Sequence, residues 1–315
     1  MRYLLAILVC LPGLLLKAQG DAVISQYVLQ PFLFNPAAAG SEGGLQVGAL
    51  YRNQWGGIEG APQNFTLQAN LASKNNRLGY GGWLGRDSWG PYKQHQVFGS
   101  FAYRIPAGQG YFSMGLQAGL QQFNTSWADL TAFRAGDVTF TGNTGNNVFI
   151  PNFGAGLYFK NDKLSAGFSV PRLLGSTVFD NKHITQINYY TANFDYRVNF
   201  GEHFGILPAT LIKWTKSSAQ VDFNLYLIFA KMVWVGAAYR SDKSANFSLQ
   251  YHLTKGNNNF RIAYSYDLAN GAYRNVTGSG THEISLVYVL KQSKKKAEET
   301  PVVPMQDINP IAPEQ

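Results

Sequence analysis

Hydrophobic and polar residues alternate over long stretches of this chain. In residues 260–268, Phe260 and Ile262 fall on one face of an extended chain, while Arg261 and Ala263 fall on the other. Side chains of a β-strand point alternately to its two faces, so a period of two over eight or more residues predicts a strand with one apolar and one polar face. The same pattern runs through 112–121, 221–229 and 247–254.

The alternation predicts about fourteen strands, most of them close to the ~9–11 residues that a tilted membrane-spanning strand needs. The two weakest are 77–86, which is rich in glycine, and 205–215, where Pro208 lies among apolar residues on both faces. The expected strands are 44–54, 63–72, 77–86, 94–104, 110–121, 149–160, 163–172, 187–199, 205–215, 219–230, 231–241, 244–254, 259–269 and 281–291.

Composition separates a membrane barrel from a soluble β-sandwich, which also alternates. Charged residues make up 14% of the chain, below the ~25% of a typical soluble domain, and the sequence contains 18 tyrosines and 21 phenylalanines. Strands of soluble sandwiches are also shorter, about five or six residues. We therefore expect an all-β protein, a transmembrane antiparallel up-and-down β-barrel of about fourteen strands of the outer-membrane type, because such barrels carry apolar residues at every second position.

The expected connections differ in length at the two ends of the barrel. Ser73–Arg77, Pro106–Gln109 and 161–162 are short, whereas the connections at the other end include the long 122–148 and 173–186. Short periplasmic turns and longer outer loops are typical of outer-membrane barrels. Two outer connections, 216–218 and 242–243, are short and follow the rule less well.

Segments outside the strands divide the chain into four parts. Residues 1–20 combine Arg2, an apolar stretch and small residues, as a secretory signal peptide does. Residues 21–43 are expected to be an irregular N-terminal segment that forms a partial plug of the barrel or a periplasmic contact. Residues 44–291 form the outer-membrane barrel, and residues 292–315, rich in lysine, glutamate and proline, form an extended periplasmic tail. The only cysteine, Cys10, leaves with the signal peptide, so no disulfides are expected.

The charge balance adds little to the functional picture. The chain carries a net charge of +8, and removal of Arg2 and Lys17 with the signal peptide leaves +6. An exported basic protein seldom meets nucleic acid, so we expect no nucleic-acid partner and attribute the surplus to a solvated tail and loops.

Catalytic and metal-binding patterns are absent from the sequence. The five histidines have no metal-ligand spacing, and no GxSxG sequence is present. His252 shares a predicted inner face with Ser248, but a barrel lumen is polar in any case, and His282 and Glu283 point to opposite faces of their strand. We therefore expect no enzymatic activity, no cofactor and no metal.

Arginines on the predicted inner faces allow two interpretations. They could line an anion-selective pore, or they could pair with inward carboxylates. We favour pairing because both signs of charge are present on the inner faces. The arginines are Arg52, Arg104, Arg197, Arg240 and Arg261, and the carboxylates are Asp195, Asp222, Asp267 and Glu283.

Short motifs follow one another along nearly the whole mature chain. They are Ser25-Gln26-Tyr27, Asn35-Pro36-Ala37-Ala38-Ala39-Gly40, Tyr51-Arg52-Asn53-Gln54-Trp55, Gly60-Ala61-Pro62, Gly167-Phe168-Ser169-Val170-Pro171, Pro208 with Lys213, Gly236-Ala237-Ala238-Tyr239-Arg240-Ser241 and His282-Glu283-Ile284. In this order they resemble the motifs of the PorP/SprF family, outer-membrane proteins of Bacteroidota associated with type IX secretion and gliding. Each motif alone is weak, and the ordered set is the specific feature. The chain departs from the family in the approach to the strand after the fifth motif, which is often rich in histidine in the family and here contains only His183. Its proline-containing tail matches no family motif.

The resemblance implies a non-enzymatic barrel that serves the secretion and gliding machinery and helps to export or anchor a secreted surface protein, such as an adhesin with a type B C-terminal domain. The implied partners are outer-membrane lipid, that secreted protein and other type IX components, including a periplasmic peptidoglycan-associated protein that the tail would reach. The alternative is a passive diffusion channel for small solutes. Family-motif and structural positions of interest are Asn35, Pro36, Gly40, Tyr51, Arg52, Trp55, Gly60, Pro62, Pro171, Tyr239, Arg240 and Glu283.

Small residues on the predicted inner faces bear on the plug hypothesis. A barrel of about fourteen strands is wider than the eight-stranded barrels that side chains fill. Gly115, Gly119, Gly154, Gly156 and Gly167 would leave room inside it. We expect residues 21–43 to use that room, with Arg52 facing the lumen and Tyr51 and Trp55 near the outer interface of the membrane.

Overall fold

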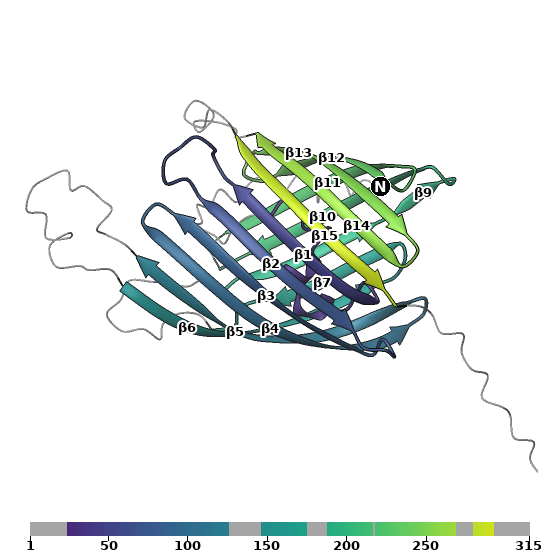
Figure 1. Cartoon of the computed structure of the whole chain (residues 1–315), viewed down its shortest axis with the longest axis horizontal. Helices are drawn as coiled ribbons and strands as arrows, with labels where there is room; N and C mark the ends of the chain where they lie inside the picture. The colour runs from purple at the N-terminus through teal and green to yellow at the C-terminus, as the bar shows by residue number, and fades with distance from the viewer. Residues whose placement is uncertain (1–23, 126–145, 175–187, 217, 269–279, 293–315) are drawn as a thin grey trace, which may run out of the picture.

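The computed structural model describes residues 24–125, 146–174, 188–216, 218–268 and 280–292. All of its strands belong to one antiparallel sheet, wound obliquely around a barrel (Figure 1). The strands are β1 (Gly44–Asn53), β2 (Gln63–Ala72), β3 (Leu78–Trp89), β4 (Tyr92–Ala107), β5 (Gly110–Thr125), β6 (Asn146–Lys160), β7 (Leu164–Val170), β8 (Tyr190–Tyr196), β9 (Val198–Phe200), β10 (Phe204–Trp214), β11 (Ala219–Phe229), β12 (Val233–Arg240), β13 (Ala245–Lys255), β14 (Asn258–Leu268) and β15 (Thr281–Lys291).

Pairing between the first and last strands closes the barrel. β1 pairs with β15 from Gly44 opposite Lys291 to Asn53 opposite His282, and the two strands lie side by side in Figure 1. β8 and β9 both pair with β10 and are separated only by Arg197, so they act as one interrupted strand. The result is a closed barrel of fourteen strands without a free sheet edge at the seam, as the alternation predicts.

Polarity across the wall is the reverse of that in a soluble protein. In β2, Phe65 and Leu67 face outward and are 44% and 41% exposed, whereas Gln68 and Asn70 face inward and are buried. The same alternation of exposed apolar and buried polar side chains runs through most of the other strands. This distribution suits a wall with lipid outside and a polar interior. Among the described residues, no helix is long and apolar enough to cross a membrane.

Connections at the two ends of the barrel differ in length. We call one end the turn end, because the strands there are joined through 73–77, 108–109, 161–163, 201–203, 230–232 and 256–257. We call the other the loop end, where the connections are 54–62, 90–91, 126–145, 171–189, 215–218, 241–244 and 269–280.

Residues 24–43, here called the lumen segment, lie inside the barrel. They form turns and two short 3-10 helices, η1 (Pro31–Leu33) and η2 (Pro36–Ala38). Most of their side chains are buried, and they contact inward-facing residues of strands all around the wall, including β1, β2, β5, β7, β10, β11, β14 and β15. The core of the molecule is therefore the interface between this segment and the inner wall.

The packing of the lumen segment explains two irregular strands. The inner face of β10 is apolar, because Leu207 and Leu211 pack in one cluster with Tyr27 and Phe34. On the inner face of β3, Gly81 lies against Phe32 so closely that a Cβ would come within 2.5 Å of the ring. Both strands depart from simple alternation because their inner faces pack against apolar side chains of the lumen segment, where a polar side chain would find no partner.

Candidate functional site

A cluster of charged side chains lies inside the barrel at the loop end. Its five members come from β1, β11, β12, β14 and β15, which are brought together by the closure of the sheet. Each lies near the loop end of its strand and faces inward by the alternation of the strand. The members are Arg52, Asp222, Arg240, Asp267 and Glu283.

Arg52 joins two of the carboxylates. Its Nη2 lies 2.5 Å from Oδ2 of Asp267, and its Nη1 lies 2.9 Å from Oε2 of Glu283. The side chains of all three are almost fully buried, with 4%, 6% and 0% exposure. Such charge-assisted bonds are stronger than neutral ones, and each ion would be costly to bury alone.

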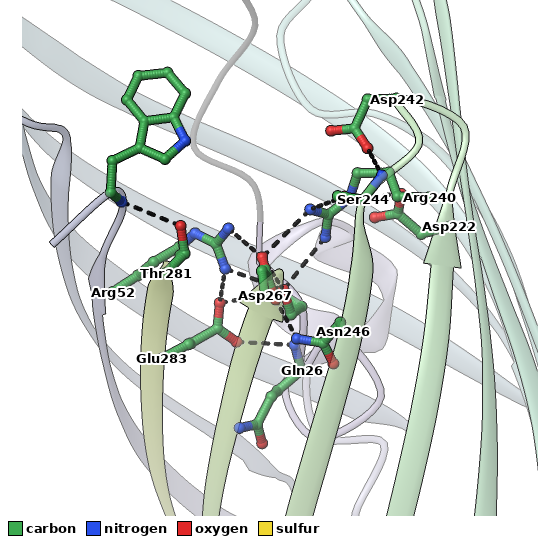
Figure 2. A network of polar contacts seen from close by, with 12 residues as sticks. Gln26, Arg52, Asp222, Arg240, Asp242, Ser244, Asn246, Asp267, Thr281 and Glu283 are labelled. Carbon is green, nitrogen blue, oxygen red and sulfur yellow. Dashed lines mark hydrogen bonds and ion pairs between the residues drawn. The ribbon is translucent and has the colours of Figure 1, made fainter. Parts of the chain in front are cut away.

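Arg240 extends the network along the wall. Its Nε lies 2.9 Å from Oδ1 of Asp222, and its Nη1 lies 3.4 Å from Oδ2 of Asp267. Asn246 donates a further short hydrogen bond to Asp267 (Figure 2). Asp267 thus accepts bonds from both arginines and stands at the centre of the cluster.

The lumen segment binds this cluster through two successive residues. The backbone N–H groups of Ser25 and Gln26 donate to the two carboxylate oxygens of Glu283, at 3.0 and 2.9 Å. The hydroxyl of Ser25 accepts bonds from Arg52 and Arg240, at 3.0 and 3.2 Å, and donates to Asp267. The first described residues of the chain are therefore fixed to the wall at the loop end, as Gln26 beside Glu283 illustrates in Figure 2.

Glu42 anchors the other end of the segment. Its carboxylate lies 2.6 Å from Nζ of Lys160, the last residue of β6, and 2.8 Å from Nη2 of Arg261 on β14. The strand order around the barrel runs β14-β15-β1-β2-β3-β4-β5-β6, so β6 is the seventh strand after β14. Seven strands are half of the fourteen-strand ring, and β6 and β14 therefore lie on opposite sides of the barrel. The side chain of Glu42 thus links opposite sides of the barrel at the turn end.

Electrostatics favours the charged form of Glu42. Burial alone would raise the pKa of this carboxyl, but the positive charges of Arg261 and Lys160 outweigh burial and hold its pKa well below the ordinary value of 4.5. The anchor is therefore ionised at neutral pH.

Between the two anchors, Asn35 and Gly40 fix the path of the segment. Asn35 caps η2 through its Oδ1 and donates from Nδ2 to the carbonyl oxygen of Leu157 at 2.8 Å. Gly40 has a φ of +70°, and its N–H donates to Asn70 at 3.0 Å. A Cβ at Gly40 would lie 2.9 Å from the carbonyl oxygen of Leu71, so the position requires glycine for both conformation and space.

Small residues of the inner wall make room for this path. A Cβ on Gly115 would collide with the backbone of Pro36 and Ala37, and a Cβ on Gly156 would collide with Asn35. Where the segment meets β8 and β10, the remaining cavity beside Tyr27 is about 10 Å³, close to the space that one water needs. The segment is closely packed against the wall.

Three of the positions singled out from the sequence, Arg52, Arg240 and Glu283, meet in the charged cluster, and Asn35, Pro36 and Gly40 meet in the middle of the lumen segment. Tyr51 and Tyr239 lie outside the site, because both face outward and are 41% and 58% exposed.

The other predicted positions shape connections at the loop end. Trp55 has a φ of 54° and donates its backbone N–H to the hydroxyl of Thr281. The carbonyl oxygens of Gly60, Pro62 and Pro171 accept hydrogen bonds from Gly90, Gln54 and Gln117, respectively.

The sequence did not identify several residues of the site. Asp267 was placed correctly on an inner face as a counter-ion, but its central position was not foreseen. Glu42 and Ser25 were not among the expected site residues. Ser25 belongs to the motif Ser25-Gln26-Tyr27, and this was the one signal that could have placed the segment beside Glu283.

The inward histidine His252 makes a hydrogen bond and a ring contact within the barrel. His252 bonds Oε1 of Gln250 at 3.0 Å and stacks on Trp234, with ring centroids 4.3 Å apart. In the part of the chain that the structure describes, no hydrogen bond joins it to Ser248. Among the residues that the structure describes, no group of three or more His, Cys, Asp or Glu could hold a metal ion.

Comparisons with known proteins bear on the chain as a whole. The family described as "Type IX secretion system membrane protein PorP/SprF" matches residues 16–288. No curated protein matches the chain.

Several solved structures resemble this chain at low sequence identity. The CymD monoaromatic hydrocarbon channel has a TM-score of 0.49 and 11% identity, over 84% of this chain and 93% of that one. The Acinetobacter baumannii protein Omp33 has a TM-score of 0.44 and 10% identity, over 79% and 98%. A Pseudomonas aeruginosa FadL homologue has a TM-score of 0.42 and 10% identity, over 78% and 89%. Likeness at this level carries no inference about function.

Proposed function

Since the chain belongs to the PorP/SprF family of type IX secretion system membrane proteins, we propose that it is a non-enzymatic outer-membrane barrel that binds a secreted surface protein and helps to export or anchor it. An adhesin with a type B C-terminal domain is the kind of cargo that we expect, and other components of the secretion and gliding machinery are its further partners.

The observation that carries this proposal is the occupied lumen. The segment that enters β1 passes through the barrel, bound by the charged cluster at the loop end and by Glu42 at the turn end. A solute channel needs a continuous water-filled path, whereas a barrel that holds a protein partner needs a rigid wall and exposed ends. The occupied lumen supports partner binding over passive diffusion.

The ends of the barrel are the expected contact surfaces. The longest connections lie at the loop end, and loops on a rigid scaffold are where binding sites concentrate. We place the loop end at the cell surface, because short turns face the periplasm in outer-membrane barrels. Strand β15 ends at the turn end, and we expect the sequence that follows it to reach periplasmic components.

Deletion of the gene followed by an inventory of the cell-surface proteins tests the proposal. We expect the loss of one or a few large surface proteins and their return when the gene is restored. Loss of every secreted cargo would instead indicate a core role in the secretion machine. An unchanged surface with slower uptake of small solutes would contradict the proposal and favour the diffusion channel.

A further inference from the structure

Charge is almost absent from the outward face of the barrel wall. Among the described strands, the outward positions carry three charged residues: Arg86 on β3, Lys93 on β4 and Lys255 on β13. Lys255 is the last residue of its strand at the turn end. Arg86 and Lys93 lie together at the loop end, so the lipid-facing surface concentrates its positive charge in one place there.

The register of β3 and β4 brings the two cations close to one another. Arg86 is directly opposite His95, and Lys93 is opposite Ser88, one step further toward the loop end. Diagonal neighbours of this kind are roughly 7–8 Å apart between Cα atoms, within reach of long side chains. Both cations are exposed, and neither makes a hydrogen bond or ion pair within the described part of the chain.

A hollow of about 430 Å³ in the outer wall is lined in part by Arg86. Its apolar lining comes from adjacent strands, β2 to β6, and Arg86, His95 and Gln122 lie on the side nearer the loop end. The apolar residues are Phe65, Leu67, Leu84, Val97, Leu120 and Phe149.

This arrangement matches an amphiphile with an anionic head. Two uncompensated cations side by side repel each other, and an anion between them would remove the repulsion. Guanidinium and ammonium groups bind phosphate through charge-assisted hydrogen bonds. Four apolar residues of the hollow, Leu67, Leu84, Val97 and Leu120, lie one row further from the loop end than Arg86, on the side where acyl chains run.

We propose that Arg86, Lys93 and the adjoining hollow form a binding site for a phosphorylated lipid of the membrane leaflet at the loop end. The phosphate binds Arg86 and Lys93, and the acyl chains lie in the hollow. The site is on the outside of the wall and is independent of the lumen segment and of the cargo that the barrel serves.

Lipid retention by the purified full chain tests the site. The protein is placed in phosphatidylcholine nanodiscs that contain bis-phosphorylated lipid A, and bound lipid A is counted by native mass spectrometry. Each basic residue near a membrane surface contributes about fivefold in affinity, so the double variant Arg86→Gln/Lys93→Gln should bind about thirty-fold more weakly. Lipid A without phosphates should bind the unaltered protein about as weakly as bis-phosphorylated lipid A binds the double variant.

Two control variants separate the site from general effects. Lys255→Gln removes the outward cation at the turn end and should leave retention unchanged. The exchange Arg86→Lys/Lys93→Arg keeps both charges and should retain the lipid, and the heat-dependent mobility of each variant on a gel reports whether its barrel has folded. Equal retention by the unaltered protein and a folded double variant, retention that does not depend on phosphate, or complete displacement by inorganic phosphate alone would overturn the proposal.

Discussion

Arg52 is the residue on which the charged cluster at the loop end most depends. It is bonded to Asp267 and Glu283 on one side and to Ser25 on the other, so it links the wall to the lumen segment. If Arg52 were lost, two carboxylates would remain buried with less compensation. Breaking a buried ion pair from one side is far more costly than replacing the whole pair by apolar residues.

Replacement of Arg52 by methionine should therefore lower the free energy of unfolding by about 3–5 kcal/mol. The measurement is urea unfolding in lipid vesicles followed by tryptophan fluorescence. Lys255→Met removes an exposed outward cation and should change the value by less than about 0.5 kcal/mol. Equal effects of the two substitutions would show that the Arg52 network contributes no stability.

The combination of Arg52→Met with Glu283→Met provides a second check in the same assay. Since the two residues share one ion pair, the double variant should be less destabilised than the sum of the single variants. A strictly additive result would mean that the pair does not act as a unit.

Glu42 should make the attachment of the lumen segment sensitive only to strongly acidic conditions. The folded-state pKa of Glu42 lies below its ordinary value of 4.5, so its stabilising effect is complete above that value and is lost as the pH falls through the lower, folded-state pKa. Hydrogen exchange of residues 24–43, corrected for intrinsic rates, should show constant protection from neutral pH down to that ordinary value. Glu42→Gln should lower protection throughout this range, and a decline in the unaltered protein just below neutral pH would contradict the assignment.

At the scale of single residues, the sequence predicted that inward arginines and carboxylates pair, but it did not predict correctly which residue pairs with which. Alternation placed Arg52, Arg240 and the carboxylates on the inner face, and two of the five inward arginines do pair with the expected acids. Arg261 pairs with Glu42 instead, and Arg197 lies over the ring of Trp234. Arg52 and Asp267 are 215 residues apart, and no local pattern specifies contacts that only sheet closure creates.

Among the structural elements, the lumen segment is the one that periodicity could not place. Its prolines predicted an irregular path, and the inward glycines predicted room inside the barrel. Alternation does not specify which glycine meets which residue of the segment, because these contacts join distant strands. The fourteen strands were predicted closely, because a wall between lipid and a polar interior imposes the period of two on nearly every strand. The two strands with the weakest predicted alternation correspond to β3 and β10, and on both of them inner-face residues pack against apolar side chains of the segment.

A side chain at Gly115 should displace the middle of the lumen segment. In Gly115→Val the new atoms would occupy the space of the backbone of Pro36 and Ala37, and overpacking of this kind costs about 1–3 kcal/mol. Hydrogen exchange at residues 36–40 should become faster. The control is Gly99→Val, at an outward position where a Cβ meets nothing within 4 Å. Unchanged exchange in a folded Gly115→Val variant would refute the packing that we describe.

At the scale of the whole molecule, the barrel is a closed wall around part of its own chain. The family to which it belongs, expected from ordered short motifs, is confirmed by the match over residues 16–288. The secreted partner that we propose is not specified by the fold, because barrels of this architecture serve many purposes. The filled lumen is the feature that separates a protein-binding role from a diffusion channel.

Conductance of the purified full chain in a planar lipid bilayer tests that distinction most directly. With the lumen segment bound at both ends, the protein should insert without opening a steady ion pathway, and the folded Gly115→Val variant should show more frequent openings. A large, steady and ohmic conductance from the unaltered protein would contradict the account, because it would mean that the segment leaves the lumen open and that the barrel is a channel.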